Sequence, residues 1–155
     1  MRQRLDLLLL AVCATNSVAQ SQELATCRNP TGRAFYHFDA LLDKAHSGWT
    51  DDKISNSVFT LTKAADGALD LLYVDSRKKP ISATQDGGIV RLLRQTPTNV
   101  TILLYYPDGG TTEIYSFFKE KDGMLRFTML QNKTGDAAPI PKSALLVGTC
   151  DSIRF

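Results

Sequence analysis

The chain has few of the residues that enzymes and metalloproteins most often use in their sites. Its 155 residues include two histidines, three cysteines and one tryptophan. The histidines, His37 and His46, have no partner spacing typical of a zinc site. The Gly-x-Ser-x-Gly motif is absent, and neither Gly-Gly pair carries the lysine and hydroxyl of a nucleotide-binding loop. We therefore expect no catalytic residue, no metal site and no cofactor, and the sequence predicts a non-enzymatic protein.

An excess of charge of one sign is also lacking. The chain has 18 Lys and Arg against 16 Asp and Glu, which leaves a formal net charge of +2. Proteins that bind nucleic acid usually present a strongly basic surface. The composition therefore predicts that nucleic acid is not a partner.

No hydrophobic run is long enough to cross a membrane. The run Leu7–Ala14 spans eight residues, whereas a spanning helix needs roughly 20. Arg2 and Arg4 precede this run, and the small residues of Ser17–Ala19 follow it, which is the layout of a secretory signal. We expect a signal peptide over residues 1–19 and a single exported β domain over residues 20–155, with no membrane insertion after cleavage.

Two cysteines remain after the signal is removed, one near each end of the domain. Cys27 and Cys150 have no histidine or reactive motif beside them, which disfavours the alternative of a nucleophilic cysteine. In an oxidising compartment such a pair forms a disulfide. The sequence therefore predicts one Cys27–Cys150 disulfide and a periplasmic or secreted location.

Between the cysteines, short segments of alternating apolar and polar residues are separated by turn sequences. Examples are residues 58–62, 68–75 and 125–131, with Asp-Gly at positions 66–67 and 122–123. Period-two alternation predicts half-buried strands, and Asp-Gly predicts tight turns. We expect an all-β antiparallel meander of about eight strands that forms a small barrel or a sandwich. Residues 38–45 are the exception, since they fit either two helical turns or a strand.

The stretch HSGWTDDK holds the only tryptophan of the chain. We select His46, Trp49, Asp51 and Asp52 as candidate binding residues of a surface loop, because tryptophan often anchors interfaces. The alternative is that Trp49 plugs one end of a barrel. Asp51 and Asp52 are adjacent and would point to opposite faces of an extended chain, which disfavours a catalytic pair of carboxylates.

Aromatic residues gather on two segments that flank a Pro-Asp-Gly-Gly turn. Tyr106 precedes this turn and Tyr115 follows it. In a meander these segments pair directly, so aromatic contacts across the strands are expected. Tyr106 and Tyr115 are therefore further candidate binding residues, and packing in the core is the alternative for both.

Four stretches together carry a resemblance to a known group of proteins. They are GWTDDKI, LLYVDS, ILLYYPDGGTTEIYSFF and IPKSALLVGTC. With them the domain resembles short exported proteins of unknown function from alphaproteobacteria. The resemblance implies export, one compact domain and a paired terminal cysteine, and it implies no catalytic residue.

These observations predict a monomeric binding or interaction module that acts through surface loops. The expected partner is a protein or glycan of the envelope or the cell exterior. One alternative is a carrier that holds a small apolar ligand in a barrel cavity, because barrels of about eight strands are either filled or hollow. The other is a hydrolase of envelope polymers that uses carboxylates of residues 39–52.

Overall fold

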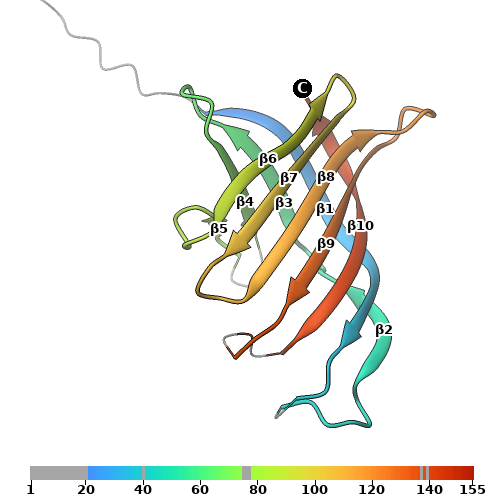
Figure 1. Ribbon diagram of the computed structural model, residues 1–155. Coiled ribbons are helices and arrows are strands. Elements are labelled where there is room, and N and C mark those ends of the chain that lie inside the picture. Colours follow the sequence, from blue (N-terminus) through green and yellow to red (C-terminus); the bar gives the residue numbers. More distant parts are fainter. Residues whose placement is uncertain (1–20, 40, 75–77, 137, 139) are drawn as a thin grey trace, which may run out of the picture.

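Ten β-strands form one antiparallel sheet in the computed structural model, which describes residues 21–39, 41–74, 78–136, 138 and 140–155 (Figure 1). The strands are β1 (Gln22–Tyr36), β2 (Gly48–Lys53), β3 (Val58–Lys63), β4 (Leu69–Val74), β5 (Pro80–Ser82), β6 (Ile89–Thr96), β7 (Asn99–Tyr106), β8 (Thr111–Lys119), β9 (Leu125–Lys133) and β10 (Lys142–Ile153). The predicted all-β antiparallel meander is confirmed, with ten strands in place of about eight. The expected signal peptide lies outside the described residues. No helix in the described part of the chain is long and apolar enough to span a membrane.

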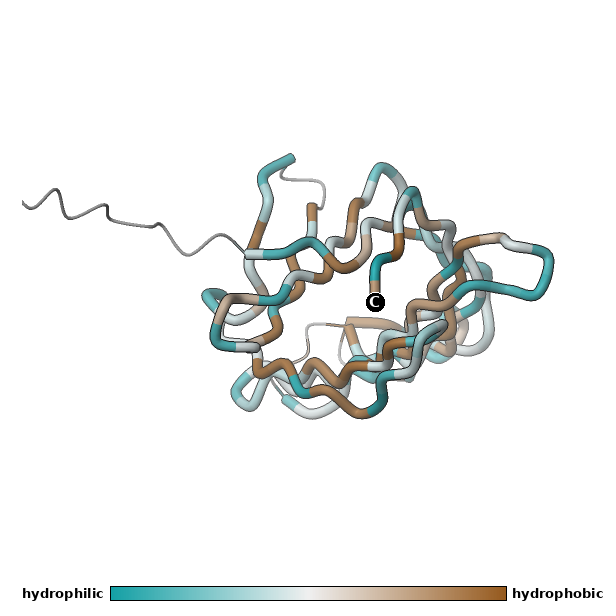
Figure 2. Tube along the Cα trace, turned by 90° about the horizontal axis from the view of Figure 1, so that it is seen from above, coloured by the Kyte–Doolittle hydropathy of each residue, from teal (hydrophilic) through white to brown (hydrophobic). Residues whose placement is uncertain are grey.

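The sheet is curled into a half-barrel. Its strands follow the order β5-β4-β3-β1-β10-β9-β8-β7-β6, and β2 pairs with β1. Viewed from above, the sheet bends around an interior, and the C-terminal end of the chain lies inside its outline (Figure 2). β4 comes close to β6, but the two strands do not form a hydrogen-bonded pair. One curled sheet, rather than a sandwich of two sheets, therefore surrounds the core.

β1 is the longest strand and connects the two sides of the half-barrel. One edge pairs with β10, while the first half of the other edge pairs with β3 and the second half with β2. The change of partner occurs at a bulge where Asn29 has a positive φ of 46° and Pro30 is fully buried. The carbonyl of Pro30 accepts from the amide of Ile54 at 3.0 Å. Since proline has no N–H to give to a ladder, a bulge is a position where a strand accommodates it.

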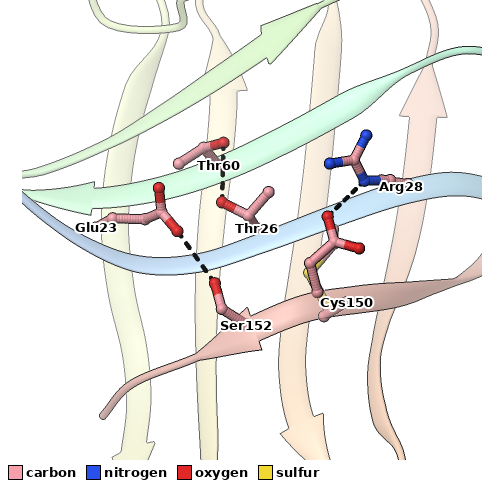
Figure 3. Close-up of a disulfide and its surroundings, with 8 residues drawn as sticks. Glu23, Thr26, Arg28, Thr60, Cys150 and Ser152 are labelled. Carbon is pink, nitrogen blue, oxygen red and sulfur yellow. Dashed lines mark hydrogen bonds and ion pairs between the residues drawn. A yellow bond between two sulfur atoms is a disulfide. The ribbon is translucent and has the colours of Figure 1, made fainter.

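The predicted disulfide joins β1 to β10. Cys27 and Cys150 are register partners on these neighbouring strands and lie 123 residues apart in the sequence. Figure 3 shows a hydrogen bond between the hydroxyls of Thr26 and Thr60 of β3, and another that Ser152 donates to Glu23, beside this disulfide. The two ends of the domain are therefore connected covalently as well as by the strand ladder.

Two Asp-Gly turns share the same backbone conformation and the same side-chain hydrogen bond. Gly67 and Gly123 have φ values of 89° and 90°, a region that glycine adopts without steric cost. The carboxylate before each glycine accepts from a backbone N–H two residues on, Asp66 from Ala68 and Asp122 from Met124. These contacts are the physical basis of the predicted turns.

Among residues 38–45, the described ones (38–39 and 41–45) form neither the predicted helical turns nor the alternative strand. The described residues of this segment form bends and turns. One carboxylate oxygen of Asp39 accepts from the backbone N–H groups of Leu41 and Leu42, each at 2.8 Å. A side chain that binds its own backbone in this way competes with regular structure.

Four aromatic rings pack together in the half of the interior that lies toward the β8–β9 turn, and we call this half the closed half. They are Phe59, Tyr115, Phe117 and Phe127, with neighbouring ring centroids between 5.5 and 6.3 Å apart. Each is at most 5% exposed. Phe155 packs against the same core from the C-terminus, which lies at this end of the half-barrel (Figures 1 and 2).

Gly148 makes room for this cluster. It is the register partner of Phe127, and a Cβ atom at Gly148 would overlap the Phe127 ring and the backbone of Arg28. Absence of a side chain on β10 therefore lets an aromatic ring from β9 lie across the sheet.

Candidate functional site

A cavity of about 600 Å³ occupies the other half of the interior. We call this half the open half; it is the end that carries the β7–β8 turn in Figure 1. Its lining residues are Ile54, Phe59, Tyr73, Val74, Asp86, Gly87, Tyr106, Asp108, Gly109, Thr111, Glu113, Tyr115, Met129, Gln131 and Lys133. Phe59, Tyr115 and Met129 belong to the core and form the floor of the cavity. The volume lies within the range of small-molecule sites, roughly 300 to 1,000 Å³.

The lining of this cavity contains a buried polar trio, Glu113, Tyr115 and Gln131. Glu113 and Gln131 are register partners on β8 and β9, and they are 8% and 7% exposed. The Tyr115 hydroxyl donates to one oxygen of Glu113 at 2.6 Å, and the Gln131 side-chain N–H donates to the other at 2.5 Å. Hydrogen bonds to an ionised carboxylate are short and strong. Both Glu113 oxygens therefore have a fixed orientation inside the half-barrel.

One atom of the trio has no partner in the described part of the protein. The Gln131 side-chain oxygen is buried and accepts no hydrogen bond. The amide orientation follows from the neighbouring carboxylate, since the N–H side has to face Glu113. An unsatisfied buried acceptor costs about 1–3 kcal/mol. The residue that carries this oxygen lines the cavity.

A second polar chain also lines the cavity. Tyr73 donates to a carboxylate oxygen of Asp86 at 2.8 Å, and Tyr106 is hydrogen-bonded to Tyr73. Burial raises the pKa of the Tyr106 phenol far above its usual value, and the bond to Tyr73 and the nearby charge of Glu113 raise it further. Burial, followed by the charge of Glu113, likewise raises the pKa of Tyr115. Both phenols therefore stay protonated at neutral pH and serve as hydrogen-bond donors.

Tyr106 and Tyr115 are the two predicted binding residues that the structure brings to this cavity. Tyr106 is half-buried in the wall, whereas Tyr115 is 2% exposed and lies in the floor. Both side chains face the interior. Core packing and a binding role are alternatives in the sequence analysis. At Tyr115 the side chain both packs in the core and lines the cavity.

Trp49 lies on the outer face of the half-barrel. The stretch expected as a surface loop is instead strand β2, because residues 48–53 pair with the second half of β1. Trp49 is 62% exposed, and its ring contacts Phe35 at 5.6 Å between centroids, with the Arg33 guanidinium 5.9 Å from the ring. Trp49 therefore does not plug the half-barrel.

A groove of about 350 Å³ runs beside Trp49 on this outer face. Its lining includes Thr112, Ile114, Leu130 and Leu145. Leu130 and Leu145 are register partners on β9 and β10 and are 47% and 50% exposed. The outer face thus carries an apolar groove that no described segment covers.

Asp51 and Asp52 point to opposite faces, as expected for neighbours on an extended strand. Asp51 is exposed and 3.8 Å from Arg33, a weak surface pair. Asp52 is largely buried and accepts from the Lys142 ammonium at 2.6 Å. Asp52 therefore attaches β2 to β10, and its carboxylate is occupied by a structural ion pair.

His46 lies apart from both the cavity and the groove. Its ring Nδ1 is 2.7 Å from a carboxylate oxygen of Asp43, three residues earlier. This hydrogen bond lowers the pKa of Asp43, and both groups are exposed. Within the described residues, no three His, Cys, Asp or Glu side chains gather into a group that could hold a metal ion.

Sequence reasoning missed Glu113, Gln131, Asp86 and Asp108. Two of them carried a readable signal, because Glu113 falls on the same strand face as Tyr115, and Gln131 on the same face as Met129. A polar residue on the apolar face of a predicted strand has to find a buried partner. Asp86 and Asp108 lie in turns, where polar residues are ordinary and carry no such signal.

Comparisons with protein-family models, with curated proteins and with solved structures find no match to this chain.

Proposed function

We propose that the protein binds a small organic molecule inside the open half of the half-barrel. The observation that supports this most is the buried trio of Glu113, Tyr115 and Gln131 in the wall of a cavity of about 600 Å³. Burying a carboxylate and leaving a buried acceptor unpaired both lower stability. A binding role explains why polar groups are placed here, at the end of an otherwise apolar core.

The lining combines apolar and polar surfaces in separate places. Phe59 and Met129 offer an apolar floor, while the polar trio and the Tyr106–Tyr73–Asp86 chain lie on the walls. Sites for small molecules commonly have a hydrophobic lining with a few placed polar groups. The ligand we propose therefore has an apolar body and at least one polar group. The role is binding without catalysis, in line with the absence of a catalytic motif in the sequence.

The location we propose is an oxidising compartment, periplasmic or extracellular. The Cys27–Cys150 disulfide supports it, since such bonds persist mainly outside the reducing cytosol. The signal-like N-terminal sequence supports it independently.

Two neighbouring threonines provide a matched test. Thr111 lines the cavity, whereas Thr112 lines the outer groove. The neutral apolar dye Nile red should bind the native protein saturably, with a rise in fluorescence. Thr111→Trp should abolish this binding by filling the cavity, and Thr112→Trp should leave it unchanged. No saturable binding to the folded protein, or loss only in Thr112→Trp, would overturn the proposal.

The outer groove supports a second candidate function, recognition of a macromolecular partner from the same compartment. The observation that favours it is the 62% exposure of Trp49 beside Leu130 and Leu145, because exposed apolar patches often mark interaction sites. The same pair of variants tests it. A partner held through the groove should be lost by Thr112→Trp and by Trp49→Ala, and retained by Thr111→Trp.

A further inference from the structure

We infer that the cavity in the open half selects a ligand that carries a protonated amine on an apolar body. This inference rests on the proposed small-molecule function and names the class of ligand. It follows from which hydrogen-bonding groups of the wall are already occupied, and from the charge that surrounds them.

The hydroxyl donors of the two polar chains are already used inside the protein. Tyr115 donates to Glu113, Tyr73 donates to Asp86, and Tyr106 is hydrogen-bonded to Tyr73. Because Tyr73 gives its proton to Asp86, its oxygen is the acceptor in the bond with Tyr106. The hydroxyl groups therefore offer mainly lone pairs to a ligand.

The acceptors of the same wall are in excess. The Gln131 side-chain oxygen accepts no bond, and each Glu113 oxygen accepts one bond while having lone pairs for more. Gln131 is more than nine-tenths buried, and its side chain has to turn toward the cavity before a ligand meets the oxygen. A ligand group that donates several hydrogen bonds would pair with these acceptor atoms, whereas a ligand group that only accepts hydrogen bonds would leave them unpaired.

The charges of the lining favour a cation over a neutral donor. Among the described residues that line the cavity, three carry a carboxylate, Asp86, Asp108 and Glu113, and Lys133 carries an ammonium group. Glu113 is buried and lies in the interior of the cavity, whereas Asp86 and Asp108 are exposed and lie at its mouth. A cleft lined by charge of one sign attracts ligands of the opposite sign.

Aromatic rings beside these carboxylates reinforce the same preference. Phe59, Tyr73 and Tyr106 all line the cavity. The face of an aromatic ring attracts a cation through its quadrupole. A protonated amine would thus meet carboxylates, an unpaired amide oxygen and ring faces in one space, and an anionic ligand would meet a buried carboxylate of like charge.

Three ligands that share one aromatic body test this inference: naphthylmethylamine, naphthylmethanol and naphthoic acid. Each is used to displace Nile red from the native protein at neutral pH. The amine should bind about tenfold or more tightly than the alcohol, the order of effect of a hydrogen bond between charged groups, and the acid should bind weakest. Added salt should weaken the amine alone, because screening acts on its charge.

Paired variants show which charges carry the preference. Glu113→Gln should remove most of the advantage of the amine over the alcohol, and Asp108→Asn should reduce it by a smaller factor. Asp122→Asn is the matched control, since Asp122 is exposed in the β8–β9 turn at the opposite end of the half-barrel. It should change neither affinity. If Glu113→Gln fails to fold, Asp108→Asn against Asp122→Asn carries the test alone.

The outcomes separate this inference from the proposed function. Equal binding of the three ligands, tighter binding of the acid, or equal effects of Asp108→Asn and Asp122→Asn would overturn the amine preference and leave the cavity as a binding site. Absence of any saturable binding, including that of Nile red, would overturn both.

Discussion

The inward faces of β8 and β9 differ sharply between the closed half and the open half. In the closed half the facing pair is Phe117 and Phe127, and both rings are completely buried. Four residues along each strand, in the open half, the facing pair is Glu113 and Gln131. The pair between them, Tyr115 and Met129, combines an apolar body with one hydroxyl. The same two strands therefore form a packed core at one end and a polar cavity wall at the other.

This difference shows that a strand face specifies two properties separately. The period of two residues decides which side chains point inward, and it holds along the whole length of both strands. The position along the strand decides whether the inward side chain meets packed rings or a hollow space. Stability should depend on the closed half, and binding on the open half.

The largest effect on stability should come from the disulfide, which joins the first and the last long strand. Replacing both Cys27 and Cys150 by serine should lower the free energy of unfolding by up to roughly 4–5 kcal/mol, because a loop of this length is no longer closed in the unfolded chain. Urea denaturation of the oxidised protein and the double variant measures this. If the free energy of unfolding falls by less than about 1 kcal/mol, the hydrogen bonds between β1 and β10 hold the two strands together without the disulfide.

The next effect should come from Phe127, at the centre of the closed half. Phe127→Ala should lower the free energy of unfolding by about 3–5 kcal/mol, because a buried ring is replaced by a cavity. Thr111→Ala, the control in the open half, should change it by no more than about 0.5 kcal/mol. Equal losses in the two variants would mean that both halves are packed to the same degree.

Alkaline pH should lower the free energy of unfolding through the buried phenols, by less than the loss of the disulfide or of Phe127 does. The unfolded chain ionises its tyrosines near pH 10, whereas folded Tyr106 and Tyr115 keep their protons to higher pH. Above pH 10 the folded state therefore binds more protons than the unfolded state, and stability falls as pH rises further. Below pH 10 these two groups make no pH-dependent contribution.

The absorbance of tyrosinate measures this directly. Fewer than all five tyrosines should ionise near pH 10 in the folded protein, and all should do so in denaturant. Tyr106→Phe should remove one of the phenols that ionise late. Ionisation of every phenol in the folded protein near pH 10 would contradict the burial of both side chains.

The smallest effect on stability should come from Trp49. Trp49→Ala should change the free energy of unfolding by about 0.5 kcal/mol, because the side chain is 62% exposed and lies outside both halves of the interior. The loss of intrinsic fluorescence confirms the substitution, and circular dichroism follows unfolding. A loss of several kcal/mol would assign Trp49 to the core.

Much of the fold was readable from the sequence, because alternation and turn chemistry are local signals. The segment around Phe127 and Met129 shows period two, and Asp122-Gly123 marks the turn before it. The Cys27–Cys150 pair was also predictable, because these are the only two cysteines after residue 19. Strand β2 was missed because GWTDDK has few apolar residues, and its pairing with β1 depends on a bulge about 20 residues earlier.

The candidate site was only partly predictable. Tyr106 and Tyr115 were selected because they flank a turn, and both contribute to the cavity. Glu113 and Gln131 needed knowledge of the register between β8 and β9 and of the curl of the sheet, which together decide that they face a hollow space. Neither quantity is encoded in a local pattern, since both arise from the packing of the whole half-barrel.

The most direct test of the binding site is an NMR titration of the isotope-labelled native protein with naphthylmethylamine. The measured quantity is the change in chemical shift of each backbone amide. The account predicts shifts concentrated in the open half, from Tyr106 to Glu113 and at Gln131, with the amides of Phe117 and Phe127 unchanged. Shifts concentrated instead around Trp49 and Leu145 on the outer face would contradict it, as would a spectrum that the ligand does not change.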